Sequence, residues 1–163
     1  MPKYDLRHLV AALALATPLM AKTAAAADYA VIVMDVAVEK SADEVWKKIG
    51  GYCDISAWLK LSYVYTSGSG DVGTMRRLAD RIDEVMVAKT PHPYTYTQPT
   101  TTILYHGTLD VQPNGANTSK IVYTLFYDQE PLKTAEAKAA DRAQRTKRFQ
   151  EALQVMKTMS EAK

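Results

Sequence analysis

The stretch DEVWKKIGGYCDISAWL, residues 43–59, contains both tryptophans of the chain, Trp46 and Trp58. A glycine pair, Gly50 and Gly51, lies between them. Glycine commonly ends helices because it has no Cβ atom and tolerates unusual backbone angles. The stretch therefore predicts two short helices that meet at a break and carry the bulkiest side chains of the protein.

The first of these helices has a clear start. Ser41 is a typical N-cap residue, and Glu44 follows three positions later, which is the spacing of a capping box. The apolar face of this helix consists of Val45, Trp46 and Ile49. Asp54 or Ser56 can start the second helical turn, whose apolar residues are Ile55, Trp58 and Leu59.

The segments on either side of the two helices have the pattern of β-strands. Residues 29–39 are rich in β-branched side chains with a two-residue period, and we expect a strand there. Six similar runs follow the helices, and Gly, Pro or Asn marks their boundaries. They cover residues 61–67, 73–79, 82–89, 94–98, 104–112 and 119–127. Short strands at roughly ten-residue spacing predict an antiparallel meander.

The C-terminal segment, residues 132–159, is rich in good helix formers and contains no Gly or Pro. Its predicted inward stripe consists of Ala135, Ala139, Ala143, Thr146, Phe149, Leu153, Met156 and Ser160. The first half of this stripe is small and the second half is large. Either the sheet comes closer to the alanine half, or a cavity remains beneath it, and we favour the cavity.

The N-terminus has the layout of a secretory signal peptide over residues 1–27. Lys3 and Arg7 precede a short apolar run, and alanines follow it. The run is too short to span a bilayer, and Pro18 argues against the alternative of a buried helix. We therefore expect a single domain over residues 28–163 that is periplasmic or secreted, with no stable membrane span once the signal peptide is cleaved.

Charge and composition disfavour several classes of function. The predicted leader contains three of the 20 basic and one of the 18 acidic residues, which leaves 17 of each. This balance disfavours nucleic-acid binding. His92, His106 and the single cysteine Cys53 form no metal-ligand pattern, so we expect no metal site, and Cys53 is interpreted as a small buried hydrophobe. No cofactor motif is present, because GSGDVG lies between strands and does not precede a helix.

The order of elements is that of a helix-grip fold, and several motifs resemble one known family. The motifs DEVWKKIGGYCDISAWL, DVGTMRRL, LYHGTLDV and SKIVYTLFY resemble the polyketide cyclase/dehydrase-like branch of the START/Bet v 1 (SRPBCC) superfamily over residues 29–159. The resemblance implies an α+β fold in which a curved antiparallel sheet surrounds the long C-terminal helix, with a hydrophobic cavity between them. In this fold the two short helices close one end. We expect Trp46 to anchor them and Trp58 to reach the cavity or its rim.

Strand alternation predicts which side chains line that cavity. The predicted inner set is rich in tyrosine: Leu61, Tyr63, Tyr65, Tyr94, Tyr96, Tyr105, Gly107, Leu109, Val111, Ile121, Tyr123, Leu125 and Tyr127. Ten tyrosines against two phenylalanines indicate a pocket for an aromatic or polycyclic ligand that carries oxygen atoms. The alternative is that these rings are ordinary core or half-exposed strand residues.

One acidic side chain is also expected to face inward. Placing Val85 and Val87 inside places Asp83 inside as well, and leaves Glu84 and Met86 outside. The family resemblance also implies an inward acid near this position, with Arg76 as its natural partner, although alternation does not decide between Arg76 and Arg77. The pair is either a buried ion pair that joins adjacent strands or a functional base and anion anchor.

Three functions are compatible with these features. The first is an exported carrier for a hydrophobic small molecule, aromatic, isoprenoid or lipid, and the second is a cyclase or lyase acting on an aromatic substrate. The third is an accessory protein of a periplasmic oxidoreductase, an expectation that rests on the family resemblance to small exported proteins of methanol oxidation. The predicted ligand-binding residues are Trp58, Tyr63, Tyr65, Arg76, Asp83, Val85, Tyr94, Tyr96, Tyr105, Tyr123, Leu125, Tyr127 and Phe149. An enzyme would use Asp83 as the base and Tyr105, Tyr63 or Tyr123 as hydroxyl donors.

Overall fold

The computed structural model describes residues 27–162. The predicted signal peptide lies outside the described residues, apart from Ala27. The elements, in chain order, are β1 (Tyr29–Val38), α1 (Ala42–Ile49), α2 (Ile55–Leu59), β2 (Tyr63–Ser67), β3 (Met75–Leu78), β4 (Ile82–Lys89), β5 (Tyr94–Thr97), β6 (His106–Pro113), β7 (Ser119–Asp128) and α3 (Ala135–Glu161). No helix in this part of the chain is both long and apolar enough to cross a membrane.

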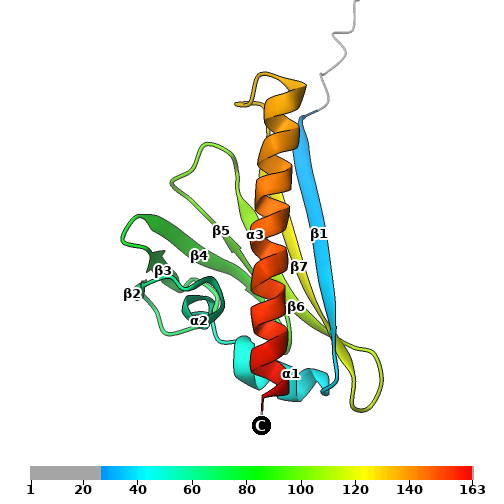
Figure 1. The fold of residues 1–163 in the computed structure, drawn as a ribbon. Coiled ribbons are helices and arrows are strands. Elements are labelled where there is room, and N and C mark those ends of the chain that lie inside the picture. Colours follow the sequence, from blue (N-terminus) through cyan, green and yellow to red (C-terminus); the bar gives the residue numbers. More distant parts are fainter. Residues whose placement is uncertain (1–26, 163) are drawn as a thin grey trace, which may run out of the picture.

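The strands form one antiparallel sheet in the order β1-β7-β6-β5-β4-β3-β2. The long helix α3 crosses one face of this sheet, while α1 and α2 lie near the C-terminal end of α3 (Figure 1). The predicted α+β helix-grip fold is therefore confirmed. The crossover that brings β7 beside β1 places the first and last strands next to each other under α3.

The capping box at α1 is formed as predicted. The Ser41 side chain accepts a hydrogen bond from the backbone N–H of Glu44, and the Ser41 N–H donates to the Glu44 carboxylate. Gly50 ends the helix with ordinary helical angles, so left-handed geometry is not the reason for glycine here. The reason is space, because a Cβ atom on Gly50 would lie only 2.3 Å from the Trp46 ring.

Several boundaries differ from the sequence prediction by a few residues. The strand expected over residues 61–67 begins at Tyr63, because Lys60 takes a left-handed conformation that ends α2. The strand expected from residue 104 begins at His106, and Leu104 is likewise left-handed. The long helix begins at Ala135, where the Thr134 side chain accepts from the Ala137 N–H and so caps the helix.

The inward face of α3 is correct in its second half and wrong in its first half. Phe149, Leu153, Met156 and Ser160 are buried, as predicted, but Ala135, Ala139 and Ala143 are exposed. The side chains of the first half that turn toward the sheet are instead polar: Lys138 pairs with Asp28, Arg142 donates to Gln129, and Arg145 lies over Tyr127. Long polar side chains bridge the distance that alanine would leave open, so the alanines do not roof a cavity.

Candidate functional site

A pocket opens between α3, α2 and the β3–β5 part of the sheet. Its volume is about 170 Å³. Its walls are formed by Ile55, Leu59, Leu61, Leu78, Ile82, Glu84, Tyr96, Gln98, Tyr105, Arg145, Arg148 and Phe149. Most of the wall is aliphatic or aromatic, and the polar groups are few, which is the usual composition of a small-molecule site.

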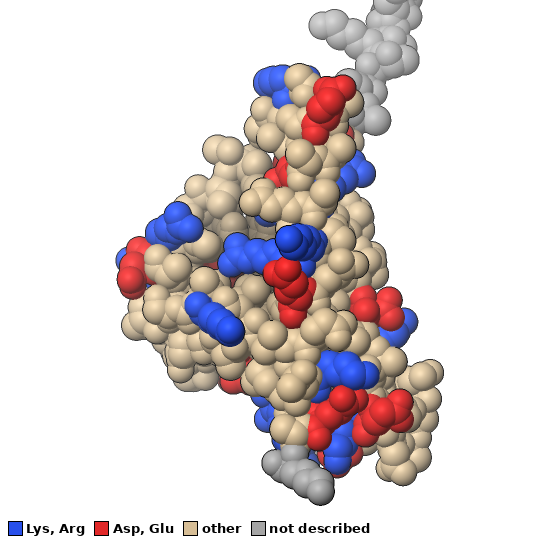
Figure 2. Space-filling model, viewed as in Figure 1, with Lys and Arg blue, Asp and Glu red and all other residues tan. Residues whose placement is uncertain are grey.

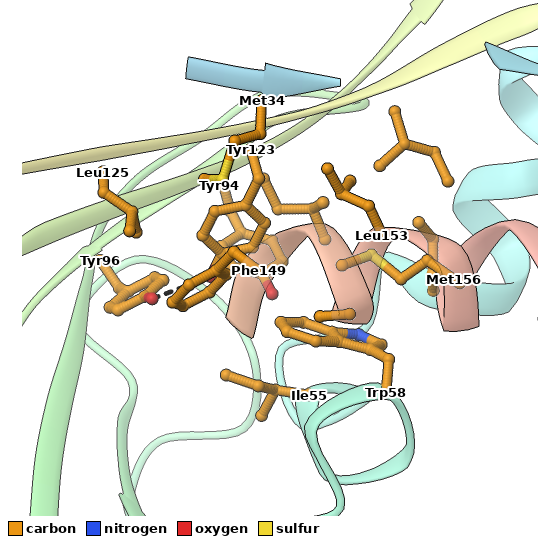
Figure 3. Close-up of a cluster of buried hydrophobic side chains, with 14 of the residues drawn as sticks. Met34, Ile55, Trp58, Tyr94, Tyr96, Tyr123, Leu125, Phe149, Leu153 and Met156 are labelled. Carbon is orange, nitrogen blue, oxygen red and sulfur yellow. Dashed lines mark hydrogen bonds between the residues drawn. The ribbon is translucent and has the colours of Figure 1, made fainter. Parts of the chain in front are cut away.

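Tyrosine side chains fill much of the space beside this pocket. The rings of Tyr94, Tyr96, Tyr105 and Tyr127 follow one another at centroid distances of 6.3 to 6.5 Å, and all four are buried. The Tyr96 and Tyr123 hydroxyls share a 2.8 Å hydrogen bond, drawn as a dashed line in Figure 3. The tyrosines of β5 and β7 that strand alternation placed inside, with Tyr105 just before β6, are therefore buried, but most of their rings pack on one another.

Gly107 makes this packing possible. It lies opposite Tyr96 in the β5–β6 ladder, and a Cβ atom on it would come within 2.4 Å of the Tyr96 ring. Glycine within a strand commonly marks such a close approach. The sequence therefore contained a signal for the position of the Tyr96 ring that the alternation pattern alone did not use.

A buried ion pair adjoins the pocket through Glu84, which is one of the lining residues. The Arg76 guanidinium donates to Glu84 Oε2 from Nε at 2.9 Å and from Nη2 at 2.6 Å, while the Gln98 amide donates to Oε1 at 2.9 Å. Arg76 is completely buried and lies 3.9 Å from the centre of the Tyr52 ring. Burial raises the pKa of Glu84, and Arg76 and Gln98 oppose that rise.

The structure decides between the two arginines and corrects the acid. Arg76 faces inward and pairs with Glu84, whereas Arg77 faces outward and pairs with Asp83 at 2.6 Å. The prediction that Asp83 points into the cavity is wrong, and the Arg77 guanidinium lowers the pKa of Asp83 at the surface. The register of β3 and β4 pairs Arg76 with Glu84 and Arg77 with Asp83. Each face of the sheet therefore has one arginine beside one acid at this position.

The same register moves Val85 off the inner wall. Glu84 and Met86 are buried, while Val85 shares the outward face with Asp83 and Val87. Tyr63 and Tyr65 lie opposite Leu78 and Arg76 in the β2–β3 ladder and so share the inner face, as alternation predicted, but 48% and 38% of their surfaces are exposed and neither lines the pocket. They belong to the edge strand β2, which α3 does not cover.

The remaining predicted residues fall into three groups. Tyr96, Tyr105 and Phe149 line the pocket. Trp58 is buried, with its ring 5.8 Å from that of Tyr123, and lines a neighbouring hollow. Buried core positions are occupied by Tyr94, Tyr123, Leu125 and Tyr127.

The lining residues that strand alternation missed come mostly from other elements. Ile55 and Leu59 are on α2, Gln98 follows β5, and Arg145 and Arg148 are on α3. Glu84 is on a strand, but Val85 and Val87 led the alternation pattern to assign the opposite face of β4 to the interior. Only the packing of α2 and α3 against the sheet brings this set together.

Two arginines of α3 stand at the pocket. The Arg145 guanidinium lies 4.4 Å from the centre of the Tyr127 ring and 5.4 Å from that of Tyr105, and it pairs with Asp141 at 3.1 Å. Burial raises the pKa of Tyr105 to about 12, and the charges of Arg145 and Arg148 oppose that rise. Both cations are therefore close enough to act electrostatically on the pocket.

Most cations of α3 interact with other groups of the chain. Lys138 pairs with Asp28, Arg142 donates to Gln129, and Arg145 pairs with Asp141. Lys147 and Arg148 remain exposed. Three of these five cations therefore form contacts within the chain, and two remain at the surface.

The arrangement suits binding through apolar contact with a few polar anchors. Within residues 27–162, no group of three or more His, Cys, Asp or Glu side chains is placed to hold a metal ion. The inner carboxylate of Glu84 is the acid nearest to the pocket interior, and each of its oxygens already accepts a hydrogen bond.

Known structures share the fold at low sequence identity. XoxI from Bacillus cereus matches with a TM-score of 0.63 and 20% identity over 79% of this chain and 94% of that one. The Zhui aromatase/cyclase from Streptomyces sp. R1128 matches with a TM-score of 0.63 and 14% identity over 82% and 94% of the two chains. Norcoclaurine synthase from Thalictrum flavum, in complex with dopamine and hydroxybenzaldehyde, matches with a TM-score of 0.51 and 20% identity over 77% and 88%.

Sequence comparison places the chain in a family. No curated protein sequence matches it. A family model described as polyketide cyclase/dehydrase and lipid transport matches residues 29–161, which is nearly the whole of the described structure. The chain thus belongs to the polyketide cyclase/dehydrase and lipid transport family.

Proposed function

We propose that the protein binds a small hydrophobic molecule, about the size of one aromatic ring, between α3 and the sheet, and carries it unchanged. The observation that supports this best is the pocket itself, whose walls are mostly aliphatic and aromatic and include a few polar groups. Export through the predicted leader would place this binding in the periplasm or outside the cell.

The size of the ligand follows from the volume of the pocket. Typical ligand pockets measure about 300–1,000 Å³, so 170 Å³ is small. An engineered cavity of about 150 Å³ is known to bind benzene. A polycyclic or isoprenoid molecule would require α2 or α3 to move, because the buried tyrosines already occupy the rest of the interior.

A neutral one-ring compound tests this proposal. Benzyl alcohol should raise the melting temperature, because a ligand that binds only the folded state stabilises it. It should also shift the amide NMR signals of α2, β4 and the Arg145–Phe149 turn of α3. The Ile82→Phe variant should lose both effects, because Ile82 lines the pocket. Ile32→Phe is the matched control, since Ile32 is a partly buried strand isoleucine outside the pocket wall.

An unchanged spectrum and melting temperature with benzyl alcohol, phenol and toluene would rule the proposal out. Equal loss of binding in both phenylalanine variants would contradict the location of the site.

The enzyme alternative retains one supporting observation, the carboxylate of Glu84 in the pocket wall. An acid–base role would belong to Glu84, because Asp83 faces the opposite side of the sheet. Glu84 would first have to release the Gln98 amide from Oε1. Chemical conversion of the added compound during the same titrations would favour an enzyme over a carrier.

A further inference from the structure

The cation that stands at the pocket without a partner is Arg148. It lies one turn after Arg145 on α3, and both line the pocket. Arg145 is engaged by Asp141 and by the Tyr127 ring. By contrast, Arg148 forms no ion pair or hydrogen bond with another side chain among residues 27–162, and it is exposed. Its guanidinium donors are therefore free to bind an anion.

Arg148 also stands where the pocket meets a second hollow on the surface. Leu59 and Arg148 line both spaces, and the second one, about 250 Å³, continues past Trp58 and Lys60 and also includes the acid Glu151 in its wall. Several basic side chains lie on this face of the molecule, on and beside α3, with acidic side chains among them (Figure 2). A polar group on a molecule seated in the pocket would emerge beside these cations.

The other charged side chain that faces the pocket beside the arginines offers no second site for an anion. The Glu84 carboxylate lines the pocket, but it is already paired with Arg76 and accepts a hydrogen bond from Gln98. The middle of the wall is apolar, with Ile55, Leu78 and Phe149 among its residues. The pocket therefore combines an apolar wall with one paired acid and one exposed cation that has no partner within the described part of the chain, so a carboxylate finds its best partner at Arg148.

We infer that the pocket takes a one-ring aromatic carboxylate, with its ring against the apolar wall and its carboxylate at Arg148. The inference rests on the proposed binding function and adds the charge and orientation of the ligand. Arginine suits this role because its planar guanidinium can donate two parallel hydrogen bonds to one carboxylate.

Benzoate and its neutral counterpart benzyl alcohol test the inference. Isothermal titration of the unmodified protein at pH 7 should show benzoate binding about tenfold more tightly, as expected for a hydrogen-bonded charge pair at a partly exposed site. The Arg148→Gln variant should lose this preference and still bind benzyl alcohol. Lys147→Gln is the matched control, because it removes the same charge from the residue directly before Arg148. Lys147 is exposed and lies outside the pocket wall.

Each outcome decides a different statement. If benzyl alcohol binds and benzoate binds no more tightly, the inferred carboxylate is wrong while the proposed binding function stands. If neither compound binds, both are wrong. If Lys147→Gln removes the preference as fully as Arg148→Gln, the effect is general electrostatic attraction, and the assignment to Arg148 is overturned.

Discussion

At the scale of single residues, the neighbouring acids Asp83 and Glu84 have opposite environments. Glu84 is 2% exposed and held by Arg76 and Gln98, whereas Asp83 pairs with Arg77 at the surface. A charge taken out of water is costly unless its partner compensates it. Removing one member of the buried pair therefore leaves an uncompensated charge, while the surface pair remains solvated.

Replacing Glu84 by Leu should lower the free energy of unfolding by about 3–5 kcal/mol, because Arg76 is left buried and unpaired. The double variant Arg76→Met/Glu84→Leu should regain much of this loss, since no buried charge remains. Asp83→Asn is the control and should change stability little, because exposed pairs are weak. Urea unfolding followed by tryptophan fluorescence measures all three; a double variant no more stable than Glu84→Leu would contradict the argument.

At the scale of elements, the two short helices divide the tryptophans differently from the sequence prediction. Trp58 on α2 is 2% exposed and packs against Tyr123 in the core, and it also lines the hollow beside the pocket. Trp46 on α1 is only partly buried, beside Tyr94 and His92. Trp46 thus contacts Tyr94 as an anchor of α1, but Trp58 is the more deeply buried of the two tryptophans.

Trp58→Ala should destabilise the protein by about 3–5 kcal/mol, the range for large aromatic residues removed from a core. Trp46→Ala should cost clearly less, because part of its ring already contacts water. Thermal unfolding followed by circular dichroism compares the two variants directly. A greater loss of stability in Trp46→Ala than in Trp58→Ala would contradict this expectation and show that the packing of α1 contributes more than that of α2.

At the scale of the whole molecule, the interior is built largely from phenol rings. Burial raises the pKa of both Tyr94 and Tyr105 to about 12. The folded state thus keeps protons that the unfolded chain releases above its ordinary tyrosine pKa of about 10. This contribution to stability is fully present below pH 10 and is lost as the pH rises from 10 toward 12.

The free energy of unfolding should accordingly fall above pH 10, by up to about 1.4 kcal/mol per pH unit for each such tyrosine. Denaturant titrations at intervals from pH 8 to pH 11.5 measure the slope. Tyr94→Phe should reduce this slope, because it removes one of the buried hydroxyls whose pKa is raised. The Tyr94 hydroxyl is buried without a hydrogen-bond partner in the described residues, so the substitution breaks no such bond. The exposed Tyr63→Phe should not reduce the slope. A stability that stays constant to pH 11.5 would contradict the expectation.

The fold was predictable from local patterns in the sequence. The capping box at Ser41, the glycine break after Ile49, the turns between the strands and the helix-forming C-terminal segment each acted within a few residues, and the structure confirms them. The inner faces of β5, β6 and β7 also followed from alternation, because there the two faces differ clearly in polarity.

The site depended on contacts between segments far apart in the chain. β4 has apolar side chains on both faces and β3 has an arginine on each, so only the pairing of the two strands decided that Glu84 and Arg76 face inward. The first half of α3 turned its charged residues inward because Asp28, Gln129 and Tyr127 were there to meet them. The sequence by itself determined the elements and their order, since these follow from local backbone preferences and hydrophobic period. Only the tertiary structure decided which charges are buried and where Arg148 stands, because burial and pairing are properties of the packed chain.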